Sequence, residues 1–435
     1  MDLATIAIIG FAVLLILLYL RMPVGLAMLL VGTVGIYFIR SNAALPKLAG
    51  EIFAEATSYP LTIIPLFVLM GNLAGVSGMS REIYGAAYAW LGRFRGGLAS
   101  AAVVGCAGFS ALSGSSLASA MTMGRVSLPE MKRFGYHDGL ATGAIAAGGT
   151  LGILIPPSAG FVVYAILTEE SIGRLFLAGV LPGLLLTLLF IAAIWISVII
   201  NPSKAPMNDT VMTAREKWLA LWKSSTILGI IFLTIGGIYT GVFSATEAAG
   251  IGAFLAFMVT LYRRKLTKDN LQDVFGQTLR ATGTVYLILF GAFVFKTFIG
   301  FTGVTYALST WVADLGLTGS QVVIAFLLLF IVLGMFLDGF AMLVLTIPLV
   351  QPILEPLGVD MVLFGVLAVI ALEMGLISPP VGMNVFIVKG VAPDVPIGTI
   401  FRGIWPFWIA MFLTLVILLV FPAVALFLPN TMFGS

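Results

Sequence analysis

Long apolar segments recur along the whole chain, and short polar connections separate them. Eight of these segments carry at most one charged residue each: 4–20, 23–39, 61–73, 173–200, 227–239, 248–262, 284–299 and 406–427. A helix needs about 20 mostly apolar residues to cross the hydrocarbon core of a bilayer. The pattern therefore predicts an all-α integral membrane protein. The rest of the apolar sequence is interrupted by Gly, Ser, Asp and Pro, so it does not form simple spans.

Two interruptions lie in the first half. The sequence GFSALSGSS at 108–116 stands between apolar arms that are too short to be two spans, and it predicts a re-entrant hairpin at about 97–124 with serines at its tip. The alternative is one helix whose Ser and Gly line a helix contact. The sequence GGTLGILIPPS at 148–158 predicts a broken helix at about 139–168, because each proline frees a carbonyl one turn back. A plain proline kink is the alternative there.

The second half contains corresponding interruptions. The sequence FLDGF at 336–340 predicts the tip of a hairpin at about 320–352, and EMGLISPPVGMN at 373–384 predicts a helix broken within about 361–390. A shift of 223 residues places the first Pro-Pro pair on the second, and Ser115 on Asp338. Paired interruptions of this kind are typical of carriers built from two repeats with a binding site near the bilayer midplane. We therefore predict repeats at 1–222 and 223–435.

Each repeat is expected to have five full crossings, besides its hairpin, and this odd number makes the two repeats inverted in the membrane. This topology places 18 of the 22 lysines and arginines on one face. Because basic residues are enriched in cytoplasmic loops, that face is predicted to be cytoplasmic and both termini to be periplasmic.

Composition narrows the function. The chain is 60% hydrophobic and only 9% charged, and its basic residues lie in short loops, so its net charge of +3 does not indicate a nucleic-acid partner. One cysteine and one histidine cannot form a Cys- or His-based metal cluster. No phosphate-binding loop of the Gly-x-x-x-x-Gly-Lys type is present, so we expect neither ATP hydrolysis nor another enzymatic activity.

Three carboxylates fall in or beside apolar segments, where a charge is costly to insert. Asp338 is expected to be a sodium ligand, a cap of the hairpin tip or a group that faces the substrate. Glu373 lies one turn before the second break. It is expected either to cap or brace that break or to take part in transport, and the sequence favours neither role. Glu247 follows Ser244 at a predicted helix start and is expected to interact with the helix dipole.

Several motifs together resemble the large membrane subunit (DctM/SiaM type) of tripartite ATP-independent periplasmic (TRAP) transporters. They are SGSS at 113–116, SLPEM at 127–131, GGTLGILIPPS at 148–158, LTIP at 345–348 and EMGLISPPVGMN at 373–384. The resemblance covers essentially the whole chain. It implies an elevator-type sodium symporter in a bacterial inner membrane that imports a small organic acid, such as a C4-dicarboxylate or sialic acid. It also implies a periplasmic substrate-binding protein and a small four-helix membrane subunit, here expected as a separate chain.

The resemblance also implies site residues. One sodium site would use carbonyls or hydroxyls around Ser110, Ser113, Gly152, Ile155 and Pro157. The second would use Asp338, Gly339, Gly375, Ser378 and Val381. The organic anion would lie near Ser115, Thr150, Ser158 and Asn384. The two sodium sites are expected to be unequal, because Ile155 stands where the second repeat has Ser378.

Two other functions fit the same pattern less fully. A stand-alone ion-coupled carrier or antiporter would share the inverted repeats but need no binding protein. A structural or channel-like membrane protein would have continuous, merely kinked helices at Ser115 and Asp338.

Overall fold

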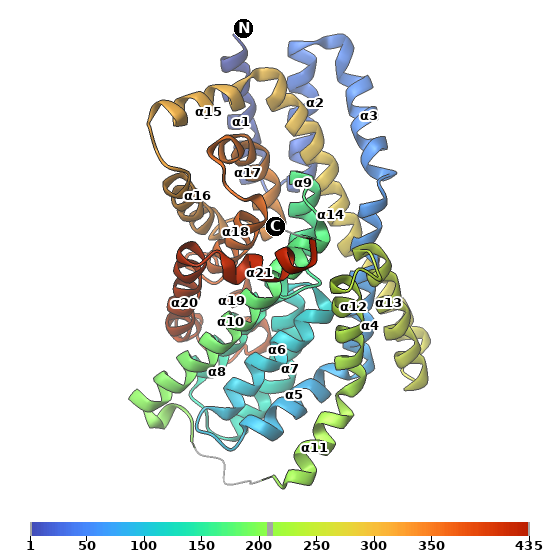
Figure 1. The fold of residues 1–435 in the computed structure, drawn as a ribbon, viewed down its shortest axis with the longest axis vertical. Coiled ribbons are helices and arrows are strands. Elements are labelled where there is room, and N and C mark those ends of the chain that lie inside the picture. Colours follow the sequence, from blue (N-terminus) through green and yellow to red (C-terminus); the bar gives the residue numbers. More distant parts are fainter. Residues whose placement is uncertain (1, 207–211, 434–435) are drawn as a thin grey trace.

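The computed structural model describes residues 2–206 and 212–433, and these form α-helices joined by short turns, with no β-strand in the described part (Figure 1). The helices of the first half are α1 (Leu3–Tyr19), α2 (Val24–Ile39), α3 (Ala44–Ala56), α4 (Ile63–Ser77), α5 (Met79–Leu91), α6 (Gly97–Ser113), α7 (Ser116–Arg133), α8 (Asp138–Leu154), α9 (Ala159–Thr168) and α10 (Ile172–Ile200).

The helices of the second half are α11 (Ala214–Lys223), α12 (Ser225–Tyr239), α13 (Ala245–Tyr262), α14 (Lys268–Thr302), α15 (Val304–Asp314), α16 (Gly319–Gly334), α17 (Gly339–Leu354), α18 (Met361–Leu376), α19 (Met383–Val391), α20 (Ile397–Val420) and α21 (Ala423–Phe433). Short 3₁₀ turns lie at Ser41–Ala43, Tyr59–Thr62, Pro202–Lys204 and Glu355–Leu357.

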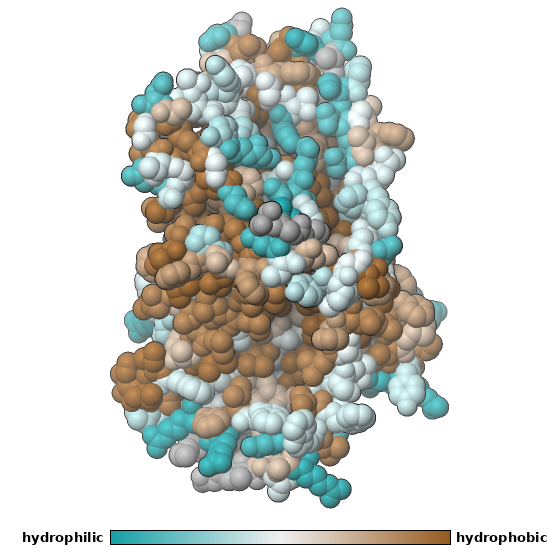
Figure 2. Space-filling model, in the orientation of Figure 1, coloured by the Kyte–Doolittle hydropathy of each residue, from teal (hydrophilic) through white to brown (hydrophobic). Residues whose placement is uncertain are grey.

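The surface has the distribution expected of a membrane protein. Hydrophobic residues form a broad band across the middle of the visible face, and hydrophilic residues gather toward its two ends (Figure 2). In the described part, six helices are long and apolar enough to cross a bilayer, or eight if each of two bent pairs, α8–α9 and α11–α12, is one span. Helices α1, α2, α16 and α18 are apolar but slightly shorter.

Side-chain caps set where several helices begin. Ser115, Ser158 and Asp338 each accept a hydrogen bond from a backbone N–H of the helix that follows, which satisfies a donor that the first turn leaves unpaired. Ser244 and Glu247 form a reciprocal capping box at the start of α13. The prediction that Glu247 interacts with its helix start is therefore confirmed.

The chain reverses at each predicted hairpin tip. Helix α6 ends at Ser113, Gly114 takes a left-handed conformation with φ +58°, and α7 begins at Ser116 and packs back against α6. The helix is thus not continuous through Ser115, which removes the single-helix alternative. Helix α7 extends to Arg133, past the expected end near residue 124. The helix continues beyond the apolar residues, and the two basic residues of its last turn interact favourably with the helix dipole.

The two halves pack crosswise. Helix α7, the second arm of the first hairpin, packs against α19, which follows the break of the second half. Helix α17, the second arm of the second hairpin, packs against α9, which follows the break of the first half. Helices α8 and α18 also contact each other. Each break therefore lies close to an arm of the other half's hairpin.

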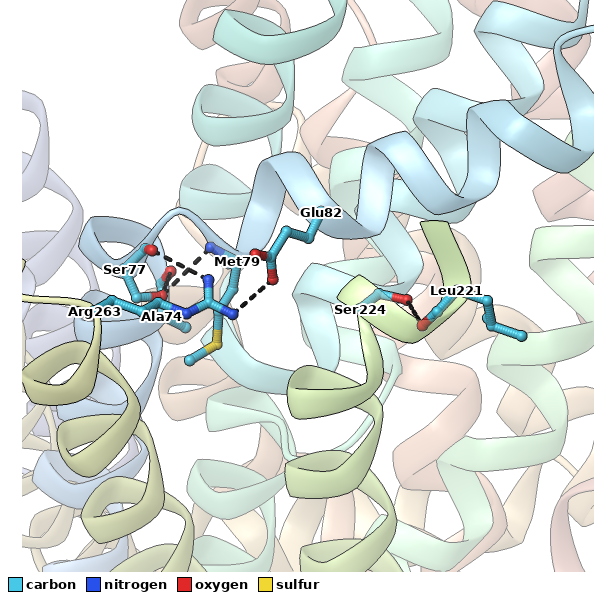
Figure 3. A network of polar contacts seen from close by, with 7 residues as sticks. All are labelled: Ala74, Ser77, Met79, Glu82, Leu221, Ser224 and Arg263. Carbon is cyan, nitrogen blue, oxygen red and sulfur yellow. Dashed lines mark hydrogen bonds and ion pairs between the residues drawn. The ribbon is translucent and has the colours of Figure 1, made fainter. Parts of the chain in front are cut away.

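Ion pairs hold two peripheral connections. At the end of α13, Arg263 Nη2 donates to Glu82 Oε2 of α5 at 2.8 Å and Arg263 Nη1 donates to the Ser77 carbonyl of α4 at 3.3 Å (Figure 3). Near the end of α7, Lys132 bonds Asp394 in the α19–α20 connection, and this hydrogen bond lowers the pKa of the Asp394 carboxyl. The first contact anchors the start of α5, and the second links hairpin arm α7 to the second half.

Candidate functional site

The tip of the first hairpin packs directly onto the first break. The amide of Ala159 donates to the Gly114 carbonyl at 3.3 Å. A Cβ added to Gly114 would lie 2.7 Å from the Pro157 carbonyl oxygen, and one added to Gly152 would lie 2.5 Å from the Ser115 carbonyl. Both approaches are too close for any side chain, so glycine is required for this contact. The tip and the break therefore form one compact unit.

Three buried hydroxyls gather beneath this tip. Ser113 Oγ lies 2.9 Å from Ser119 Oγ, and Ser110 Oγ donates to Ser119 Oγ at 3.2 Å. Ser110 and Ser113 were predicted from the resemblance, but Ser119 was not. Its signal was available: Ser119 lies one helical turn after Ser115 on α7, within a run of small residues, so its side chain faces α6.

The first break leaves carbonyl oxygens without backbone donors. Helix α8 ends at Leu154, and Ile155 is extended, with its amide bonded to the Leu151 carbonyl at 2.9 Å. The residue that would donate to the Gly152 carbonyl in a continued helix is Pro156, which has no N–H. Carbonyl oxygens and hydroxyls are hard ligands, which suit a small hard cation.

The second hairpin tip is organised by Asp338. Its Oδ1 accepts from the amides of Phe340 at 3.0 Å and Ala341 at 3.1 Å, so the carboxylate caps α17. A Cβ added to Gly339 would lie 2.9 Å from the Leu372 side chain of α18. The capping role that the sequence allowed for Asp338 is present, and its side chain is partly buried.

The second break differs from the first in its contacts. A Cβ added to Gly375 would lie 2.6 Å from Gly334 Cα, so α16 and α18 meet backbone to backbone. Ser378 Oγ donates to the Met374 carbonyl at 2.6 Å and accepts from Trp408 Nε1 of α20 at 3.0 Å. Val381 lies partly buried between this serine and α19.

The two breaks also differ in exposure. Both Pro-Pro peptide bonds are cis, yet Pro156 and Pro157 are buried whereas Pro379 and Pro380 are exposed. The Ser378 hydroxyl forms hydrogen bonds with residues of α18 and α20, and Asp338 Oδ1 accepts hydrogen bonds from amides of α17. Both hairpins thus pack directly on the helix of their own break, and the second break is held in addition by the contact between Ser378 and Trp408.

The four predicted anion-binding residues differ in how much hydrogen-bonding capacity remains. Thr150 Oγ1 donates to the Ala147 carbonyl at 2.5 Å. Ser158 Oγ donates to the Ile153 carbonyl and accepts from the Phe161 amide, and Ser115 Oγ accepts from the Ala118 amide at 3.4 Å. Asn384 on α19 is completely buried, and both its amide oxygen and nitrogen lack a hydrogen-bond partner. Asn384 is therefore the member with the most unused polar capacity.

Glu373, for which the sequence left bracing or capping and transport as alternatives, is a buried carboxylate of α18. It is 1% exposed in α18, and neither carboxylate oxygen makes a hydrogen bond. Helix α18 contacts α8 of the first half, so this carboxylate belongs to a helix at the contact between the two halves.

The fold is that of a membrane transporter. The solved structure of the Alcanivorax borkumensis YdaH transporter covers 88% of this chain and is itself covered to 88%, with a TM-score of 0.63 and 17% sequence identity. At this level of identity the likeness shows the fold alone.

Sequence comparison gives the family. The model of the "Tripartite ATP-independent periplasmic transporter, DctM component" matches residues 11–424. The C4-dicarboxylate TRAP transporter large permease protein DctM of Pseudomonas aeruginosa is 35% identical over 90% of this chain and 91% of its own length. The sialic acid TRAP transporter large permease protein SiaM of Vibrio cholerae is 32% identical over 96% of this chain and 97% of its own length. The chain therefore belongs to the DctM family of large membrane subunits of TRAP transporters.

This membership confirms the resemblance seen in the motifs. The protein is a multi-pass membrane permease, and its relatives are named as transporters rather than enzymes.

Proposed function

We propose that this permease imports a small organic acid by coupling its movement to sodium ions rather than to ATP. The observation that carries the proposal is the compact unit at the first hairpin tip. It combines the hydroxyls of Ser110, Ser113 and Ser119 with carbonyls that the Pro-Pro pair leaves without donors. No group of three or more His, Cys, Asp or Glu that could hold a metal lies within residues 2–206 and 212–433.

The substrate proposal follows from the relatives and from Asn384. The two relatives are named for C4-dicarboxylates and for sialic acid, which are both carboxylates. Asn384 offers an unpaired buried amide, and its helix packs against α7 and α8, which carry Ser115 and Thr150. A carboxylate accepts hydrogen bonds from such donors and interacts favourably with helix N-termini. We assign the anion to this region.

The proposed mechanism is an elevator movement of two inverted repeats, 1–222 and 223–435. The matching positions of Ser115 and Asp338 as helix caps, and of the two Pro-Pro breaks, support this division. The protein would lie in a bacterial inner membrane with its basic face cytoplasmic and both termini periplasmic. A periplasmic binding protein would deliver the substrate, and a small four-helix membrane subunit would accompany the permease.

Uptake into proteoliposomes tests this function. With its cognate binding protein and small subunit, the reconstituted permease should accumulate the organic acid only when sodium is higher outside. Uptake driven by a proton gradient and indifferent to sodium would contradict the coupling. Full-rate uptake of free substrate by the permease alone would instead establish a stand-alone carrier.

Ser113→Ala tests the first cation site. The substitution removes one hydroxyl of the cluster, so the sodium concentration for half-maximal uptake should rise about tenfold, which corresponds to about 1.4 kcal/mol. Ser127→Ala is the matched control, because Ser127 is buried in the same hairpin but its hydroxyl bonds only the Met123 carbonyl. An equal effect of the two variants would argue against a specific site.

Trp408→Phe tests the second cation site by removing the hydrogen bond that holds Ser378. The indole donates to Ser378 Oγ at 3.0 Å, and its loss lets the Ser378 side chain reorient. We expect a roughly threefold increase in the half-saturating sodium concentration, in keeping with the modest net value of one hydrogen bond. Trp405→Phe, at a neighbouring exposed ring, is the control. A Trp408 variant with unchanged sodium dependence would exclude this positioning role.

A further inference from the structure

A large apolar cavity lies between the first hairpin and three peripheral helices. Its volume is about 750 Å³, within the usual range for ligand pockets. Helices α5, α6, α10 and α12 form its walls, and the end of α11 closes one side. Of its 21 lining residues, only Thr187 and Ser224 carry a polar side chain other than the Trp90 indole. Such a cavity offers too few polar partners to hold ordered water, so hydrocarbon is the occupant that fits it.

Basic residues surround one end of this cavity. Trp90 lines the cavity, and the Lys217 ammonium lies 5.9 Å from its ring centroid. Exposed Lys223 directly precedes the lining residue Ser224, and exposed Arg93 follows the lining residue Leu91 by two positions. This arrangement places a positive rim at the mouth of a hydrocarbon-lined space.

Among the described residues, no carboxylate forms an ion pair with Lys217, Lys223 or Arg93. Glu216 of α11 folds back to accept from the backbone and hydroxyl of Thr213. Glu82 of α5 pairs with Arg263 at the opposite end of that helix (Figure 3). Figure 3 also shows Ser224 and Leu221 at the α11–α12 junction beside α5. Neither carboxylate therefore forms a hydrogen bond with a basic residue of the rim.

Helix α11 has the character of an interfacial helix. None of its residues is buried, and its Trp218 and Trp222 are exposed while Trp218 packs edge-on against Trp90. Amphipathic helices with tryptophan and lysine lie at the boundary between headgroups and acyl chains. A helix of this kind would place the basic rim at the depth of lipid phosphates, with the apolar cavity beside it.

We propose that this cavity binds one acyl chain of an anionic phospholipid, with the phosphate held by Lys217, Lys223 and Arg93. Ile155 and Pro156 of the first break also line the cavity. The bound chain therefore packs against the residues that precede Pro157, whose carbonyl oxygen lies beside Gly114 of the first hairpin tip, and it fills the space between these residues and α12.

Lipid retention by the purified full-length permease tests the site without any transport measurement. Native mass spectrometry with added dioleoylphosphatidylglycerol or dioleoylphosphatidylcholine compares two headgroups on identical chains. We expect about tenfold stronger retention of the anionic lipid. Lys217→Glu combined with Lys223→Glu should abolish this preference. Lys265→Glu with Lys268→Glu, a reversal of the same size just before α14 and at its first residue, should preserve it.

Two cavity variants test the chain-binding part. Ala107→Phe fills the space from α6, and Leu188→Trp fills it from the exposed face of α10, so at least one should give folded protein; both should reduce retention of either lipid about tenfold. Equal retention of the two lipids by the unmodified protein, or no effect of the folded cavity variants, would overturn the proposal. Displacement of the lipid on adding the small membrane subunit would also overturn it, by making the cavity a subunit interface.

Discussion

Gly152→Ala is expected to reduce sodium-dependent uptake at least tenfold and to lower the thermal stability of the permease. The added Cβ would lie 2.5 Å from the carbonyl carbon and oxygen of Ser115, which are backbone atoms and cannot rotate away. The hairpin tip must therefore move off α8, at a cost of about 1–3 kcal/mol for overpacking. The displacement separates Ser110 and Ser113 from the carbonyls of the break.

Gly283→Ala is the matched control for this substitution. Gly283 lies in the middle of α14, and a Cβ there meets no atom within 4 Å. Alanine should raise local helix stability by up to about 1 kcal/mol and leave uptake unchanged. Uptake at the normal rate by Gly152→Ala would show that tip-to-break contact is not required for transport.

Asp338→Ala and Asp338→Asn are expected to separate two roles of one side chain. Asparagine keeps an oxygen that can accept from the amides of Phe340 and Ala341, so thermal stability should stay close to normal. It removes the negative charge, so the half-saturating sodium concentration should rise roughly tenfold. Alanine loses both functions, and should also cost about 1 kcal/mol of stability through the lost cap.

Asp360 provides the control for these variants. It caps α18 through a 2.8 Å bond from the Leu363 amide, and it is exposed and outside both breaks. Asp360→Ala should lower stability by a similar amount without changing sodium dependence. If Asp338→Asn transports with normal sodium dependence, Asp338 is a cap only and the second cation site needs another ligand.

Sequence and structure agree best where the physical signal is local. Proline has no N–H and closes the helix before it, so the breaks at 155–158 and 377–382 could be placed within a few residues. Gly114 and Asp338 lie at tips because glycine permits a left-handed turn and aspartate caps a helix start. The exact end of α7 was missed, since an amphipathic helix can continue past the apolar residues that mark the membrane layer.

The sequence by itself determined the membrane class, the family and the two interruptions in each half. It also showed that the corresponding positions of the two breaks carry different side chains, Ile155 and Ser378. Only the tertiary structure decided the partners: Ser119 joins the hydroxyl cluster, Trp408 donates to Ser378, and the buried amide of Asn384 has no hydrogen-bond partner. The reason is that helix breaks and caps depend on neighbours within about one turn of the chain. Ligand sets, free hydrogen-bonding capacity and cavities depend on packing between helices far apart in sequence, which no local pattern records.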